Sequence, residues 1–65
     1  MALTQRQADV LAYIKKHLKA SDVPPTMREI SEHFGWASHN SAQHHLMALH
    51  AAGAVRKTNR GYVPA

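Results

Sequence analysis

A threonine followed three residues later by Gln or Glu occurs twice in this 65-residue chain, each time at the start of a helical repeat of apolar residues. In this pattern, the capping box, each side chain satisfies a free backbone N–H of the other residue, which fixes where a helix begins. The pairs are Thr4 with Gln7 and Thr26 with Glu29. They predict helices over about residues 4–20 and 27–34.

Apolar side chains recur at helical spacing in both segments. The first stripe is Leu3, Val10, Leu11, Ile14 and Leu18, and the second is Met27, Ile30 and Phe34. Ser21 and Asp22 are expected to stop the first helix. Pro24 and Pro25 stiffen the connector that follows it. Gly35 should end the second helix with a turn.

The remainder of the chain predicts one more helix and a hairpin. The third helix should cover about residues 39–52, with Ser38 as its N-cap and Gly53 as a left-handed residue after its end. In the tail, apolar residues change to the two-residue period of a strand on both sides of the polar turn TNRG, where Asn and Gly reach positive φ easily. This pattern predicts a hairpin wing over about residues 54–64. The expected fold is mainly α, a winged helix-turn-helix of three helices and a small two-stranded antiparallel β-hairpin wing, in a single domain over residues 1–65.

Composition narrows the class of protein. The chain has 8 Lys+Arg against 4 Asp+Glu, so its net charge of +4 favours a polyanionic partner. It has no cysteine for a disulfide or a thiolate metal site, which suits a reducing compartment. No apolar run approaches the roughly 18 residues of a membrane span, and no signal segment opens the chain. We therefore expect a cytoplasmic protein with no membrane partner.

The third helix, within WASHNSAQHHLMAL, is polar without being charged on one side. On a helical wheel, its core side consists of Ala42, Leu46 and Leu49. The opposite side consists of Asn40, Gln43, His44 and Met47. These donors, acceptors and one flexible apolar group match the base edges of the DNA major groove. A merely solvated face is the competing interpretation, and the absence of Lys and Glu disfavours it. His45 lies at the flank of the core side, where we expect a packed, hydrogen-bonded histidine.

Metal binding and catalysis find little support in the sequence. Two histidines can hold one ion from a helix when they are three or four residues apart. No pair has this spacing among His39, His44, His45 and His50. The chain also lacks a nucleophile motif, a phosphate-binding glycine loop and paired carboxylates. We expect neither an enzyme nor a metal or other cofactor.

The segments LTQRQADVLAYIKKHL, PPTMREISEHFGWASHNSAQHHLMAL and AAGAV resemble the amino-terminal DNA-binding domain of LexA, the bacterial SOS repressor. The resemblance covers about Leu3 to Tyr62. It implies a sequence-specific regulator of transcription that binds double-stranded DNA, most simply as a repressor. The third helix would read the major groove, and the wing would contact the backbone and the minor groove.

The resemblance also suggests which residues contact DNA. In the family, the positions that face operator bases match Ser38, Asn40, Ser41, Gln43 and His44; the helical wheel adds Met47. Contacts to the DNA backbone are expected from the helix starts and the wing. These residues are Thr4, Arg6, Arg28, Arg56, Lys57, Thr58, Asn59 and Arg60.

The chain departs from the family pattern at several positions. LexA-like proteins typically have two glutamates where this chain has Gln43 and His44, so its base preference is expected to differ. They have Arg-Lys in place of Ala51–Ala52, and often Lys in place of Met47. Arg28 is shifted by one place from the arginine that usually follows the threonine cap in the family, and the wing is a few residues shorter than in the family. The sequence contains no peptidase domain, so self-cleavage is not expected. Both a stand-alone regulator and a piece of a larger repressor fit the sequence.

Two rival functions stay open at this point. One is a protein-interaction module of the same fold that modulates a regulator without reading bases itself. The other is a metal- or pH-responsive binder that uses its histidines. For the DNA-binding function, we expect a monomer in free solution. Two copies would pair on palindromic operator half-sites through face-to-face wings.

Overall fold

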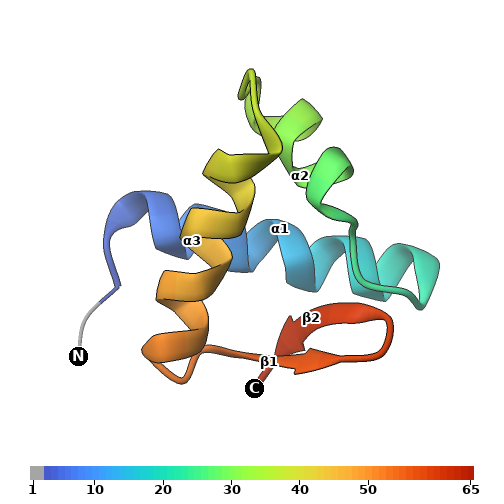
Figure 1. Cartoon of the computed structure of the whole chain (residues 1–65). Helices are drawn as coiled ribbons and strands as arrows, with labels where there is room; N and C mark the ends of the chain where they lie inside the picture. The colour runs from blue at the N-terminus through green and yellow to red at the C-terminus, as the bar shows by residue number, and fades with distance from the viewer. Residues whose placement is uncertain (1–2) are drawn as a thin grey trace.

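A computed structural model describes residues 3–65, apart from the side chain of His39, and shows three helices followed by a two-stranded antiparallel sheet (Figure 1). The helices are α1 (Gln5–Ser21), α2 (Met27–Phe34) and α3 (His39–Ala51). The strands are β1 (Val55–Thr58) and β2 (Gly61–Pro64). The fold class expected from the sequence, three helices and a hairpin wing, is confirmed.

Both capping boxes form at the helix starts. The Oγ1 atom of Thr4 accepts the N–H of Gln7 at 3.1 Å, and the N–H of Thr4 donates to Oε1 of Gln7 at 3.1 Å. Thr26 and Glu29 make the same pair of bonds at 3.1 and 2.9 Å. An N-cap of this kind contributes on the order of 1 kcal/mol to stability. The two helix starts are therefore set by local interactions within four residues.

The helix ends differ slightly from the sequence-based bounds. Ser21 is still helical, because the left-handed cap is Asp22, with φ 60°. The third helix ends one residue early, at Ala51. Gly35 and Gly53 follow α2 and α3 with φ of 71° and 77°, the conformation that glycine adopts without a steric penalty.

The hydrophobic core draws on all three helices and the first strand. Its buried members are Val10, Ile14, Ile30, Ala42, Leu46, Leu49 and Val55. The three residues of α3 in this set are those that the helical wheel turned inward. Burying a large aliphatic side chain contributes about 1.5–3 kcal/mol, so these contacts fix α3 firmly against α1 and α2. The opposite side of α3 is thereby held in solvent.

The wing is a tight hairpin that packs against the connector between α1 and α2. Its turn residues are Asn59 and Arg60, and Thr58 pairs with Gly61 at the end of the ladder. Of the two residues of this segment that reach positive φ easily, Gly61 adopts it (131°) and Asn59 does not. A Cβ on Gly61 would lie 3.4 Å from Cγ of Pro24. The glycine therefore permits the φ of this turn, and a Cβ in its place would make an ordinary van der Waals contact with Pro24.

Candidate nucleic-acid interface

The outer face of α3 presents polar, uncharged side chains to solvent. Asn40, Gln43 and His44 are exposed, and Met47 is 57% exposed although it is large and apolar. They emerge on the side of the helix opposite Ala42 and Leu46, which are buried. Amides and imidazoles combine donors and acceptors, and a thioether contacts methyl groups well, so the face can match base edges.

The two serines at the start of α3 take part in the structure of the helix. Ser38 is exposed and is the N-cap, and its Oγ accepts the N–H of Asn40 at 3.0 Å. Ser41 is half-buried, and its carbonyl lies 2.7 Å from Nδ1 of His45. A hydroxyl that caps a helix can still donate its own proton outward. Ser38 is therefore the more accessible of the two predicted contacts.

The wing carries its cations on different faces. Lys57 and its register partner Tyr62 line a groove at the side of α3. Because successive residues of a strand point to opposite faces, Arg56 points away from this groove. Arg60 is exposed in the turn beside Asn59. Thr58, the last residue of β1, is partly engaged within the hairpin, since its Oγ1 donates to the carbonyl of Gly61 at 2.8 Å.

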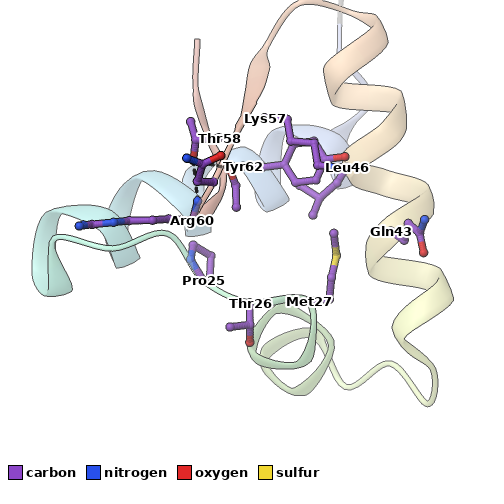
Figure 2. A pocket seen from close by; sticks show the side chains of 11 residues that line it. Pro25, Thr26, Met27, Gln43, Leu46, Lys57, Thr58, Arg60 and Tyr62 are labelled. Carbon is purple, nitrogen blue, oxygen red and sulfur yellow. Dashed lines mark hydrogen bonds between the residues drawn. The ribbon is translucent and has the colours of Figure 1, made fainter.

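A groove of about 400 Å³ lies between the start of α2, the side of α3 and the wing (Figure 2). Its apolar lining comes from Pro25, Met27, Leu46 and Tyr62, and its polar lining from Thr26, Gln43, Lys57, Thr58, Asn59 and Arg60. The groove joins Gln43 of the α3 face to the wing. An apolar floor with a cationic rim suits a sugar–phosphate strand, which offers apolar deoxyribose and anionic phosphate together.

Charge is distributed unevenly along the chain. Residues 1–34 hold five basic and four acidic residues, a net charge of +1, whereas residues 35–65 hold three basic residues and no acid, a net charge of +3. The second segment comprises α3 and the wing. These two elements therefore present a surface to a polyanion with no carboxylate of their own to repel it.

The DNA-contacting residues predicted at the starts of α1 and α2 do not line the groove. Thr4 is exposed but caps α1. Arg6 lies with its guanidinium carbon 6.0 Å from the ring centre of Trp36. Arg28 donates from Nε to Oε1 of Glu32 at 3.0 Å, and both side chains are mostly exposed. Such an exposed pair is weak, so Arg28 can exchange its partner at little cost.

The pKa of two groups in α1 and α2 departs clearly from the usual value. Hydrogen bonding from the backbone of Thr26, and then from the side chain of His17 3.1 Å away, lowers the pKa of the Glu29 carboxyl. Burial raises the pKa of the Tyr13 hydroxyl, and the carboxylates of Glu29 and Glu32 add to this effect. The effect on Glu29 therefore comes first from the capping box of α2 and then from its contact with α1.

Within residues 3–65, leaving aside the side chain of His39, no three His, Asp or Glu side chains gather as a metal site would require. None of the described helices is long and apolar enough to cross a bilayer. His39, which the sequence analysis weighed as a metal ligand, has its side chain outside the described part.

The sequence model of the protein family described as the LexA DNA-binding domain matches residues 1–62 of the chain. The chain belongs to the LexA DNA-binding domain family. It is 45% identical to LexA repressor 1 of Pseudomonas putida over 58 residues. The aligned residues make up 89% of this chain and 29% of that protein. It is 49% identical over 55 residues to the LexA repressor of Dechloromonas aromatica, covering 85% of this chain and 27% of that protein. The LexA repressor of Haemophilus influenzae strain PittGG is 47% identical over 53 residues, or 82% of this chain and 26% of that repressor. The chain thus spans less than a third of the length of these curated relatives.

Sequence analysis did not predict several of the residues that line the candidate interface. Thr26, Met27 and Tyr62 line the groove, yet none was assigned to it. The sequence predicted the capped start of α2 at Thr26 and the turn at Gly61. It could not predict that these two segments lie close together, because this depends on how the connector between α1 and α2 packs on the wing. Leu46 was assigned to the core alone, and it also reaches the groove floor.

Proposed function

We propose that this LexA-family domain binds double-stranded DNA in a sequence-specific way and serves a transcriptional repressor. The observation that carries the proposal is the junction in the groove between the uncharged, amide-bearing face of α3 and an acid-free cationic wing. Amides give directional hydrogen bonds that distinguish bases, whereas Lys and Arg supply attraction to any phosphate. We also propose that the protein acts in the cytoplasm of a bacterial cell, where its DNA partner lies.

In this proposal, α3 enters the major groove. The base-reading side chains are Ser38, Asn40, Ser41, Gln43, His44 and Met47. The DNA strand beside α3 passes the groove of Figure 2, with Lys57 and Arg60 at its phosphates. Thr4, Arg6, Arg28 and Arg56 meet phosphates beyond the groove, whereas Thr58 and Asn59 of the wing meet the backbone from within its lining. We treat residues 1–65 as one such domain, which covers one half-site of a palindromic operator.

Promoter occupation is the simplest form of repression that such a domain supports, because it needs only tight and specific binding. One domain of this size contacts one half-site. We propose that it is a monomer in solution and that two copies pair on adjacent half-sites.

Selection of bound sequences from random duplex DNA tests the proposal. A LexA-type reader enriches one sequence of half-site length, and its affinity for that sequence exceeds its affinity for random duplex at least about 10³-fold. Enrichment of no sequence, with binding that depends only on salt, contradicts base reading. Absence of any binding to duplex DNA at low salt would instead favour a protein-interaction module of the same fold.

A further inference from the structure

The start of α3 is held from outside the DNA face by an aromatic stack. Trp36, in the turn before α3, has its ring centre 5.0 Å from that of Phe34 with an angle of 18° between the planes. Its other stacking partner is His45, at 4.6 Å and 13°. Trp36 thus joins the last residue of α2 to the middle of α3 through two nearly parallel ring contacts.

His45 is oriented by a second contact. Its Nδ1 atom lies 2.7 Å from the carbonyl oxygen of Ser41, one turn earlier, so the nitrogen donates to the oxygen. With Nδ1 held in this way, the ring plane is fixed against the indole. The stack holds α3 at His45, about two turns from its start, and the turns between carry Asn40 and Gln43.

The turn itself is tied to α2. The N–H of Trp36 donates to the carbonyl of Ser31 at 2.8 Å, and Oγ of the buried Ser31 donates to the carbonyl of Ser38 at 3.4 Å. Arg6 adds a cation 6.0 Å from the indole centre. Trp36 and its neighbours therefore contact all three helices, although none of these contacts needs DNA.

We infer that His45 is a positioning residue: stacked on Trp36, it sets the angle at which Asn40 and Gln43 meet the bases, without touching DNA itself. Base readout depends on hydrogen bonds that tolerate little misalignment, whereas phosphate attraction tolerates much more. Loss of the stack should therefore reduce discrimination between sequences more than it reduces binding as such. The inference rests on the proposed function and names how that site is kept in register.

Three variants separate this role from general stability. His45→Ala removes the ring and the hydrogen bond, whereas His45→Phe keeps a ring on Trp36. His33→Ala is the matched control, because His33 also stacks on an aromatic ring, that of Tyr13, at 4.1 Å, and lies on α2. The affinity of each variant for the preferred duplex and for random duplex is measured at a temperature where all are folded. The near-ultraviolet circular dichroism of Trp36, the single tryptophan, reports the stack directly.

The expected result is a specificity ratio lowered about tenfold in His45→Ala, the size of one weakened base contact. His45→Phe should recover most of the ratio together with the indole signal, and His33→Ala should keep both. An unchanged ratio in His45→Ala overturns the inference, as does an equal loss in His33→Ala. Failure of wild type to prefer any sequence would overturn the proposed function as well, so the two failures are distinguishable.

Discussion

The outer face of α3 and the wing border the same groove, yet they differ in chemistry and in support. The α3 face carries amides, imidazole and a thioether on a helix anchored by three buried residues. The wing carries Arg56, Lys57 and Arg60 on a hairpin whose single fully buried residue, among those described, is Val55. Directional readout needs a rigid support, whereas a point charge acts over several ångströms. The difference supports our proposal that base recognition and backbone attraction are divided between these two elements.

The largest effect is expected from removing an amide of the α3 face. Asn40→Ala should cost on the order of 1–3 kcal/mol on the preferred duplex and little on random duplex, because an amide reads adenine through one donor and one acceptor. Fluorescence anisotropy with both duplexes measures this. His50→Ala is the control, since His50 is exposed near the end of the same helix. Equal losses on the two duplexes would remove Asn40 from base readout.

The support of the wing is tested by Gly61→Ala. A φ of 131° is unfavourable for any residue with a Cβ, whereas the new Cβ would make only an ordinary contact with Pro24 at 3.4 Å, so the strain of the backbone should lower the free energy of unfolding by about 1–3 kcal/mol. Thermal melts measure the loss. Gly53→Ala, with φ 77° and open space around the new Cβ, should cost less. A smaller loss in Gly61→Ala than in Gly53→Ala would show that the wing does not depend on the φ of Gly61.

A smaller effect is expected from a single cation of the wing. Arg60→Ala should weaken binding on all duplexes alike and reduce the slope of log affinity against log salt by about one, because one fewer phosphate counterion is released. Lys19→Ala removes the same charge from the last turn of α1, and should change the slope much less. Identical slopes for wild type and Arg60→Ala would exclude the wing turn as a backbone contact.

The smallest effect concerns acid stability through Glu29. Its pKa is lowered in the folded protein, so ionised Glu29 contributes stability above its usual pKa of 4.5, and this contribution is lost as the pH falls through the lower folded value. Melts between about pH 6 and 3 should show a shallower acid decline for Glu29→Gln, which keeps a capping amide. The same decline in both proteins would contradict a role for the charge.

Local features of the structure could be predicted from the sequence, and features made by tertiary packing could not. The capping boxes act within four residues, and the inward side of α3 follows from helical periodicity. The groove instead requires Gly61 to meet Pro24, a contact between segments far apart in the chain. The helical wheel placed His45 beside the core, but it could not show that Trp36 would stack on it.

The most direct test of the division between α3 and the wing uses two residues that line the same groove, Gln43 and Lys57. Binding of wild type, Gln43→Ala and Lys57→Ala is measured over a range of salt on the preferred duplex and on random duplex. We expect Gln43→Ala to lose about tenfold or more on the preferred duplex alone, with its salt slope unchanged. Lys57→Ala should lose affinity on both duplexes and reduce the slope by about one. If the two variants behave alike on both duplexes and at every salt concentration, the helix and the wing do not divide recognition in this way.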